Sequence, residues 1–225
     1  MIVGNGLLAN GFIEESFDHK KFIVFVSGVS DSKKTNEEDF NREKTLLLKT
    51  ISENKGLKLL YFSSILTGVQ DNRYYHHKLE VEDIVKKNSK DYIIFRVPQI
   101  IGKGGNKNNL VNYLKQSLIN GEEIVIFKNT YRSLIDVIDL VKIVNYCKDI
   151  VSCDIVYVSN VEKIMVLDLL KNMSTFLGVV PKYKLIDGQS NNWTIENSDI
   201  INEAVINLKI TTHGYTNKII KKYIN

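Results

Sequence analysis

Short apolar runs alternate with amphipathic segments along the first half of the chain. Continuous apolar runs at residues 22–26 (FIVFV), 57–62 (LKLLYF) and 92–97 (YIIFRV) are typical of strands that are buried on both faces of a parallel sheet. Residues 37–52 and 74–87, which lie between these runs, repeat apolar residues at helical spacing. Strands that alternate with helices of this length predict an α/β fold with a doubly wound parallel sheet.

The apolar positions of the two helices predict which faces are buried. The expected stripes consist of Phe40, Leu47, Leu48 and Ile51 in the first helix, and of Val81, Ile84 and Val85 in the second. Gly56 closes the first of these helices, because glycine readily takes the left-handed conformation that follows a helix end. Both helices therefore have one face for the sheet and one for solvent.

The remaining elements are more mixed. Residues 1–3 form a minimal strand that runs directly into Gly4-Asn5-Gly6 and a short helical segment. The pattern further predicts helices at 110–119, 137–150 and 167–177 and strands at 123–127 and 154–158. We expect a single domain over residues 1–225, with a small lobe from segments at about 101–128 and 160–225.

Composition excludes several classes of protein. A chain of 225 residues with 44% hydrophobic residues can bury a full core. The net charge of +4 comes from scattered lysines rather than from a basic patch with aromatic residues, so no nucleic-acid partner is expected. No apolar run approaches the roughly 20 residues of a membrane span, and no apolar leader opens the chain. Cys147 and Cys153 are too few for a disulfide framework, so we expect a cytoplasmic protein with reduced thiols.

The glycine turn near the start is the first candidate binding site. Gly4, Asn5, Gly6, Leu7 and Leu8 belong to a G-x-G-x-x-A pattern between a strand and a helix. Glycines in that position let the backbone approach a pyrophosphate, which then lies at the helix N-terminus. The alternative is a glycine-rich turn of the kind that opens many α/β domains, without a ligand.

Ser63, Tyr74 and Lys78 are the candidate catalytic residues. A Tyr-x-x-x-Lys spacing arises by chance in a lysine-rich chain, so the catalytic interpretation depends on where the pair lies relative to the predicted strands. Ser63 lies at the carboxyl end of a predicted strand, and Tyr74 and Lys78 share one helix face. A nearby ammonium and an oxidised nicotinamide would favour the phenolate of a tyrosine that otherwise titrates near pH ~10. A serine hydroxyl would polarise the substrate oxygen, although a turn or cap serine is the simpler alternative.

The order of these features resembles the extended short-chain dehydrogenase/reductases, the NAD-dependent epimerase/dehydratase family that acts on nucleotide sugars. Residues 59–68 (LLYFSSILTG) resemble the family's strand that ends in Ser or Thr five residues before a glycine, which selects Ser63 over Ser64. Residues 95–105 (FRVPQIIGKGG) resemble the segment that lines the nicotinamide and then the sugar. Residues 131–140 (YRSLIDVIDL) resemble the segment whose arginine usually holds a nucleotide phosphate.

The resemblance implies a Rossmann-like fold with a small C-terminal substrate-binding lobe, and a set of site residues. Besides the glycine turn, the implied cofactor-binding residues are Ser27, Gly28, Val29, Tyr74, Lys78, Arg96 and Val97. The implied substrate-binding residues are Ser64, Gln99, Asn109 and Arg132, and for Arg132 the alternative is a structural ion pair with Asp136 or Asp139. No metal site is expected, because His76 and His77 have no third ligand at metal spacing and are predicted to lie on the helix surface.

The chain also departs from the family pattern. Only 23 residues separate Gly4 from Ser27, so the second and third strands of the usual sheet are predicted to be absent, together with the acid that grips the adenosine ribose. Lys33 and Lys34 in the nearest loop would tolerate or attract a phosphate. The expected cofactor is therefore NAD(P), with NADP somewhat favoured, and Asp31 in the acid's role is the alternative.

Two further departures concern the strand end. Thr67 replaces the usual tyrosine of the serine segment. Ser64 and Ile65 stand where the 4,6-dehydratase subgroup has an Asp-Glu pair, which argues against removal of water from the sugar.

The expected function is a nucleotide-sugar oxidoreductase, either a keto-sugar reductase or an epimerase. Abundant Lys, Asn and Ile are typical of AT-rich bacterial genomes, which suggests a role in surface polysaccharide synthesis. The main alternative is a non-catalytic nucleotide-binding or regulatory protein of the same fold. A flavin-type reductase or an NmrA-like sensor is more distant, because a sensor need not keep Tyr74 and Lys78. Family members often pair through the helices at 37–52 and 74–87, so a homodimer is a further expectation.

Overall fold

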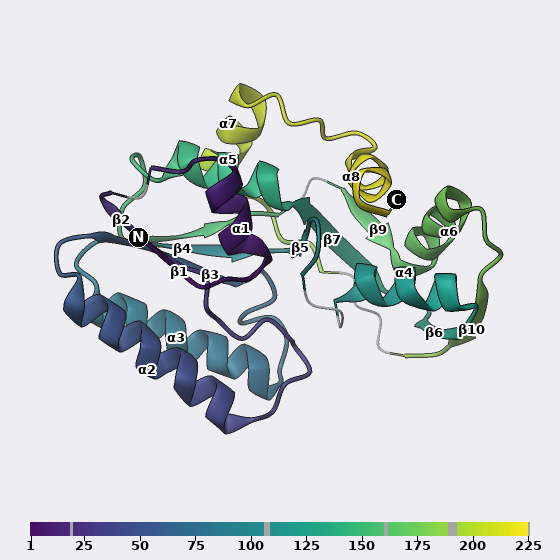
Figure 1. Cartoon of the computed structure of the whole chain (residues 1–225), viewed down its shortest axis with the longest axis horizontal. Helices are drawn as coiled ribbons and strands as arrows, with labels where there is room; N and C mark the ends of the chain where they lie inside the picture. Colours follow the sequence, from purple (N-terminus) through teal and green to yellow (C-terminus); the bar gives the residue numbers. More distant parts are fainter. Residues whose placement is uncertain (19, 106–108, 160–161, 189–192, 225) are drawn as a thin grey trace.

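The computed structural model describes residues 1–18, 20–105, 109–159, 162–188 and 193–224. A parallel five-stranded sheet lies at its centre (Figure 1). Its strands are, in spatial order, β1 (Ile2–Val3), β2 (Phe22–Phe25), β3 (Lys58–Ser64), β4 (Tyr92–Val97) and β8 (Asp154–Tyr157). The predicted α/β fold with a Rossmann-like parallel sheet is confirmed.

Helices cover both faces of this sheet (Figure 1). Helices α2 (Glu37–Glu53) and α3 (Arg73–Asn88) lie on one face, and α1 (Leu7–Glu14) and α5 (Val137–Cys147) lie on the other. The first face buries Ile23, Phe25, Leu59 and Tyr61, and the second buries Phe22, Val24, Leu60 and Phe95. Successive residues of one strand thus enter different cores, which explains the continuous apolar runs.

The sheet stops at β1. This strand has two residues and pairs with β2 on one side, and no other strand pairs with it in the described part of the chain. The chain passes from β1 through α1 directly into β2, the neighbouring strand of the same sheet. The predicted shortening of the N-terminal half is therefore confirmed.

A second core lies beside the sheet, at the right of Figure 1. It is formed by α4 (Leu110–Asn120), α6 (Val166–Leu177), α8 (Tyr215–Ile224) and the parallel pair β6 (Glu123–Phe127) and β10 (Lys182–Ile186). A three-stranded sheet of β5 (Gln99–Ile101), β7 (Tyr131–Asp136) and β9 (Lys163–Met165) adjoins this core. Helix α7 (Asp199–Asn207) packs against α5 instead, so the predicted lobe segment 160–225 contains one helix of the main layers.

The buried stripe of α2 differs from the predicted one. Phe40 and Leu47 are buried, but Leu48 is 42% exposed. Glu43 and Thr50 occupy the buried positions between and after the two apolar residues. Spacing of three and four residues places them on the same helix face as Phe40 and Leu47, and Glu43 thereby becomes a buried carboxylate.

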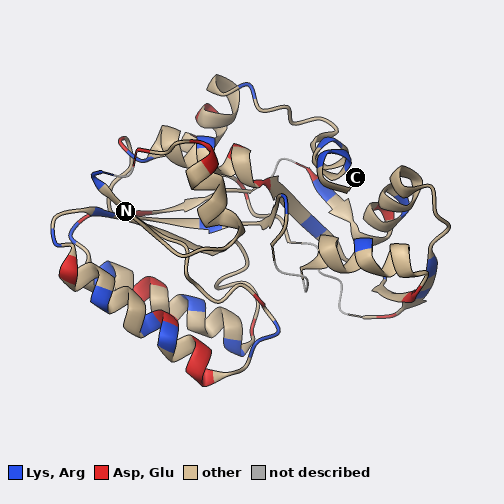
Figure 2. Ribbon diagram, viewed as in Figure 1, with Lys and Arg blue, Asp and Glu red and all other residues tan. Residues whose placement is uncertain are grey.

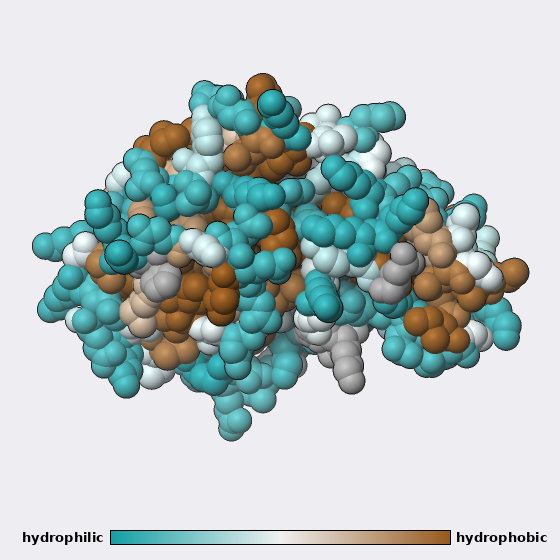
Figure 3. Space-filling view, turned by 45° about the horizontal axis from the view of Figure 1, so that its top comes forward, coloured by the Kyte–Doolittle hydropathy of each residue, from teal (hydrophilic) through white to brown (hydrophobic). Residues whose placement is uncertain are grey.

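Charged residues of both signs are mixed over the surface, most visibly on α2 and α3 (Figure 2). Apolar side chains gather at the end of the molecule that carries β6 and β10 (Figure 3), where Val125, Phe127 and Val180 are exposed. No helix among the described residues has the length and apolar character needed to cross a bilayer.

Candidate active site

The glycine turn has the geometry of a phosphate-binding turn. Gly4 has a φ of +137°, and a Cβ there would lie 2.7 Å from the Val26 carbonyl oxygen, so only glycine fits. Gly6 is the N-cap of α1, with no side-chain cap, and a Cβ at Gly6 would meet nothing within 4 Å. No side chain therefore caps the first N–H groups of α1, which leaves them available to an anion at the helix N-terminus.

Glu43 of α2 connects the loop after β2 to α3, the other helix on the same face of the sheet. Its Oε2 accepts a hydrogen bond of 2.7 Å from the Val29 backbone N–H, directly after Ser27 and Gly28. A Cβ at Gly28 would lie 2.8 Å from Glu43 Oε1 and 2.9 Å from Lys78 Nζ. The loop between β2 and α2 therefore lies directly on the Glu43–Lys78 ion pair.

The Glu43 carboxylate is fully buried and hydrogen-bonded to three side chains. It accepts from the Tyr61 hydroxyl at 2.9 Å and the Lys78 Nζ at 3.1 Å, and it pairs with the His77 Nε2 at 2.8 Å. Burial opposes the charge, but the Lys78 ammonium and the hydrogen bonds of His77 and Val29 hold the pKa of Glu43 well below its ordinary value. The carboxylate is ionised at neutral pH.

Tyr74 and Lys78 lie close together, as their spacing predicts. The Lys78 Nζ is 5.7 Å from the centre of the Tyr74 ring and 3.2 Å from the Tyr61 hydroxyl. The Tyr74 ring packs in a cluster with Val29 and Phe40. Burial, followed by the charges of Glu43 and Asp31, raises the pKa of Tyr74 well above its ordinary value. This direction is opposite to the predicted activation by Lys78, because burial and the Glu43 carboxylate, which also binds the Lys78 ammonium, both disfavour the phenolate.

Ser63 lies at the end of β3, buried beneath the loop that follows. Its hydroxyl hydrogen-bonds with the Thr67 hydroxyl at 3.2 Å. The described residues contain no hydrogen bond between Ser63 and Tyr74. Thr67, which replaces a tyrosine of the family pattern, is thus the hydroxyl partner of Ser63 here.

The two histidines differ in their surroundings. His76 is exposed beside Asp71, as predicted, but His77 is completely buried. The His77 ring stacks on Phe40 with 4.3 Å between ring centres and reaches Glu43. The surface prediction for His77 was wrong because α3 packs against α2 as well as against the sheet, so a second face of α3 is buried.

Arg96 is occupied by an internal ion pair. Its guanidinium binds Glu82 through two hydrogen bonds of 3.0 and 2.6 Å and donates a third of 2.8 Å to the Tyr157 hydroxyl. A cofactor contact by this side chain would require breaking the pair. Val97, the next residue, ends β4 and pairs with Ser64 of β3. The backbone of Val97, rather than the Arg96 side chain, is therefore the part of residues 95–105 that is available at the carboxyl end of the sheet.

Arg132 has no acidic partner among the described residues. Its guanidinium donates a hydrogen bond of 2.8 Å to the Tyr131 carbonyl oxygen, and burial lowers its pKa. The acids that were its expected alternative partners are bound by α8. Asp136 pairs with Lys222 at 2.8 Å, and Asp139 accepts from the Tyr215 hydroxyl at 2.9 Å. The structural ion pair proposed as an alternative is therefore absent.

Tyr75 lies near Arg132 and Ser64, and two further predicted substrate-binding residues differ in whether their side chains are already hydrogen-bonded. Burial raises the pKa of Tyr75 to about 12, while the nearby Arg132 guanidinium and Ser64 hydroxyl act in the opposite direction. Gln99 Nε2, on the strand that pairs with β7, is buried without a hydrogen-bond partner. Asn109 caps α4 by accepting from the Asn112 N–H at 2.8 Å, so its side chain is already used locally.

The fold is shared with solved enzymes. No protein-family model matches the sequence, and a search of curated proteins finds no relative. A UDP-N-acetylglucosamine 4-epimerase from Methanobrevibacter ruminantium, in complex with UDP-N-acetylmuramic acid, superposes with a TM-score of 0.69 at 15% identity over 96% of this chain and 79% of that chain. A dTDP-glucose 4,6-dehydratase from Bacillus anthracis, in complex with NAD, gives 0.72 at 11% identity over 98% and 77%. RMD from Pseudomonas aeruginosa, complexed with NADPH, gives 0.67 at 12% over 90% and 80%.

The chain therefore shares the Rossmann-like α/β fold of these solved structures. In this fold, as in other open α/β sheets, ligands bind at the carboxyl ends of the strands. The glycine turn, Ser63, Ser64 and Val97 all follow or end strands of the main sheet at that edge.

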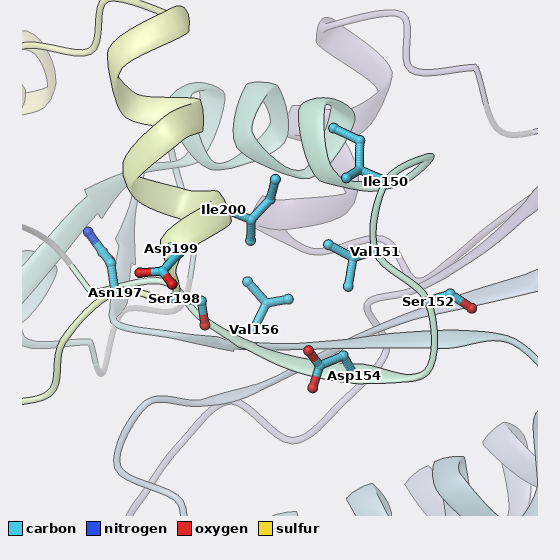
Figure 4. A pocket seen from close by; sticks show the side chains of 9 residues that line it. All are labelled: Ile150, Val151, Ser152, Asp154, Val156, Asn197, Ser198, Asp199 and Ile200. Atoms are coloured by element: carbon cyan, nitrogen blue, oxygen red, sulfur yellow. The ribbon is translucent and has the colours of Figure 1, made fainter.

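Another hollow lies away from this edge. It is a groove beside the edge strand β8, lined by apolar Ile150, Val151 and Ile200 and by the carboxylates of Asp154 and Asp199 (Figure 4). Asp154 is the first residue of β8, so the groove begins at the amino end of the strand. The described residues contain no group of three or more His, Cys, Asp or Glu placed to hold a metal.

Proposed function

We propose that the protein is an NAD(P)-dependent nucleotide-sugar oxidoreductase. The observation that carries this proposal is Arg132, a half-buried cation without an acidic partner in the described chain. An uncompensated buried charge is costly, and a nucleotide diphosphate would supply the missing anion through two-pronged hydrogen bonds. The unpaired Gln99 amide and the Ser64 and Tyr75 hydroxyls would then contact the remainder of the substrate.

The residues at the other end of the site fit a nicotinamide dinucleotide. The open N-terminus of α1 would hold the pyrophosphate, and Ser27 to Val29 would border the nicotinamide half. Lys78 uses two N–H groups on Glu43 and Tyr61, and its third remains for a ribose hydroxyl. When bound in its reduced form, this cofactor supplies the hydride for a keto carbon. The similar structures with NAD and with NADPH support this class of cofactor.

The adenosine side favours the 2′-phosphorylated cofactor. Asp31, the alternative acid, accepts the Lys33 backbone N–H at 2.9 Å and so closes its own turn. Lys34 pairs with Asp39 at 2.9 Å, which leaves Lys33 as the more available cation in this loop. With β1 at the sheet edge, no further strand of the described chain presents an acid to the ribose.

The chain's own residues would carry the proton chemistry of a keto-sugar reduction. Arg132 holds the diphosphate, and Ser63 polarises the substrate carbonyl oxygen. Tyr74 donates its proton to that oxygen as the carbonyl carbon gains hydrogen, so the products are an alcohol and a tyrosinate that solvent reprotonates.

We place this activity in the bacterial cytoplasm, where Cys147 and Cys153, both free, stay reduced. Surface polysaccharide synthesis is the proposed setting, and a homodimer through α2 and α3 is the proposed assembly.

One observation favours the non-catalytic alternative. Lys78 is neutralised by Glu43, and Tyr74 is harder to ionise than an ordinary tyrosine. A protein that only binds a nucleotide needs no phenolate. Under this alternative the site keeps Arg132 and the glycine turn as its binding groups and performs no reduction.

The decisive comparison is between Tyr74→Phe and Tyr75→Phe. We expect Tyr74→Phe to lower turnover of a keto-sugar nucleotide by about 10²–10⁴, the usual contribution of general acid catalysis. Tyr75→Phe, which removes the hydroxyl beside Arg132, should change KM more than kcat. Turnover of Tyr74→Phe within about threefold of wild type would contradict the assignment. A wild-type protein that binds sugar nucleotides but turns none over would support the alternative.

A further inference from the structure

Glu43 stands out among the carboxylates of the protein because its environment is almost entirely cationic or hydrogen-donating. It lies in the apolar stripe of α2, where a charged side chain is rarely buried without a partner. Its two oxygens accept from Val29, Tyr61 and Lys78 and pair with His77. The side chain is thus held by a loop, a strand and a neighbouring helix, and its position is fixed.

The consequence falls on Lys78. A free ammonium near a phenol stabilises the phenolate and makes the tyrosine a better base. Here the Glu43 Oε1 lies 3.1 Å from the Lys78 Nζ, while the same Nζ is 5.7 Å from the centre of the Tyr74 ring. The two opposite charges cancel at the distance of Tyr74, which then senses a nearly neutral pair within a buried environment.

Other charged or titratable groups also face Tyr74. They are Glu43 from α2, Asp31 from the loop before it, Tyr61 from β3, and Tyr75 and Lys78 from the helix that carries Tyr74. Lys78 is the single cation of this set, and it is the one that Glu43 binds. The balance therefore disfavours a negative charge on Tyr74.

We propose that Glu43 is a positioning residue that cancels the charge of Lys78, keeps Tyr74 protonated and so makes the site a proton donor for keto-sugar reduction. This proposal rests on the proposed function and decides between its two forms. A reductase starts from a protonated tyrosine, which gives its proton to the carbonyl oxygen. An epimerase must first take a proton from a sugar hydroxyl, which requires a tyrosinate at the start.

Fluorine NMR of the intact protein tests the proposal without substrate or cofactor. With 3-fluorotyrosine incorporated, the resonance that is lost in Tyr74→Phe reports the ionisation of residue 74. We expect residue 74 to titrate at higher pH than the free fluorotyrosine amino acid. Titration below the free amino acid would overturn the proposal. Because no turnover is measured, this result is independent of whether the protein proves to be a reductase.

Charge variants sharpen the test. In Glu43→Gln the lost carboxylate and the unmasked Lys78 both favour the phenolate, so the titration of Tyr74 should move down by on the order of one pH unit or more. Glu80→Gln is the matched control, because Glu80 is an exposed carboxylate of α3 that pairs with Lys44 and Arg73. It should leave Tyr74 unchanged.

Folding of the variant does not limit this test. If Glu43→Gln is folded and Tyr74 titrates as in wild type, Glu43 has only a structural role and the proposal is wrong. If the variant does not fold, the double variant Glu43→Gln with Lys78→Gln removes both charges together, and Tyr74 should titrate within about half a unit of wild type. A large shift in the double variant would also contradict the cancellation of charge.

Discussion

Two cations of the candidate site, Lys78 and Arg132, have opposite surroundings. Lys78 is buried and bound to a buried carboxylate, whereas Arg132 is half-buried and has no acidic partner in the described chain. A desolvated charge needs a counter-charge from the protein or from a ligand. The charge of Lys78 is therefore balanced within the protein, whereas Arg132, which the proposed function assigns to the substrate, would be balanced only by a bound anion.

Arg96 shows that this chain pairs an arginine when the role is structural. Glu82, fully buried, meets the Arg96 guanidinium with two hydrogen bonds. Asp136 and Asp139, the acids closest in sequence to Arg132, are used instead to attach α8. The absence of a partner for Arg132 in the described chain is therefore not explained by a shortage of nearby acids.

The largest expected effect is a difference in stability between variants of Lys78 and of Arg132. Lys78→Met leaves Glu43 buried without its ammonium, and breaking a buried pair from one side costs about 3–5 kcal/mol. Arg132→Met removes an unpaired cation and should change the free energy of unfolding by less than ~1 kcal/mol. Thermal unfolding without ligands measures both losses of stability. In a chain of this size, each kcal/mol lowers the melting temperature by roughly 2–4 °C. Equal losses would show that Arg132 has a structural partner.

The same ion pair predicts how stability depends on pH. Because the fold lowers the pKa of Glu43, the stabilisation is present above the unfolded carboxyl pKa of about 4.3. It is lost progressively as pH falls below that value. Glu43→Gln should flatten this part of the curve in urea unfolding between pH 3 and 7, and an unchanged slope would contradict an ionised Glu43.

A smaller effect is expected from Arg132→Lys. Lysine keeps the charge but loses the planar fork that binds two phosphate oxygens, so affinity for a nucleotide diphosphate should fall about tenfold to a hundredfold, as for a charged hydrogen bond of about 1.5–3 kcal/mol. The melting temperature without ligand should barely move. Unchanged affinity with a large loss of melting temperature would instead assign Arg132 to the scaffold.

The smallest effect concerns cofactor choice. With β1 at the edge of the sheet and Lys33 in the nearest loop, NADPH should bind at least as tightly as NADH. Fluorescence titration of both dinucleotides measures the ratio, and Lys33→Gln should reduce any preference for NADPH. A preference for NADH of more than about tenfold, or ~1.4 kcal/mol, would show that an acid such as Asp31 grips the ribose.

The main sheet was predictable because β2, β3, β4 and β8 each contain a continuous apolar run. The helical spacing of apolar residues predicted α2 to α6. The short distance from Gly4 to Ser27 predicted that two strands of the usual sheet are absent. Strands β5, β7, β9 and β10 were not predicted, because they are short, polar in part and half exposed. Their pairing depends on segments distant in sequence, which local patterns do not contain.

The parts of the site that depend on spacing along one helix were predictable from the sequence. The parts that depend on packing between helices were not. Spacing placed Tyr74 and Lys78 on one helix face, but the partner of Lys78 was missed. Glu43 stands three residues after Phe40 and four before Leu47, and a carboxylate at that point of an apolar stripe is the feature that could have revealed it. His77 was wrongly predicted to lie on the surface, because its burial depends on the contact between α2 and α3. The sequence of either helix alone does not reveal that contact.

Calorimetric titration of the unmodified protein tests whether Arg132 forms a diphosphate site separate from the cofactor site. Protein saturated with NADPH is titrated with UDP, and the experiment is repeated with the Arg132→Met variant. We expect that one UDP binds each wild-type chain without displacing NADPH, and that the variant binds NADPH normally but UDP at least tenfold more weakly. Displacement of NADPH by UDP, or equal UDP affinity in the variant, would contradict a separate diphosphate site at Arg132.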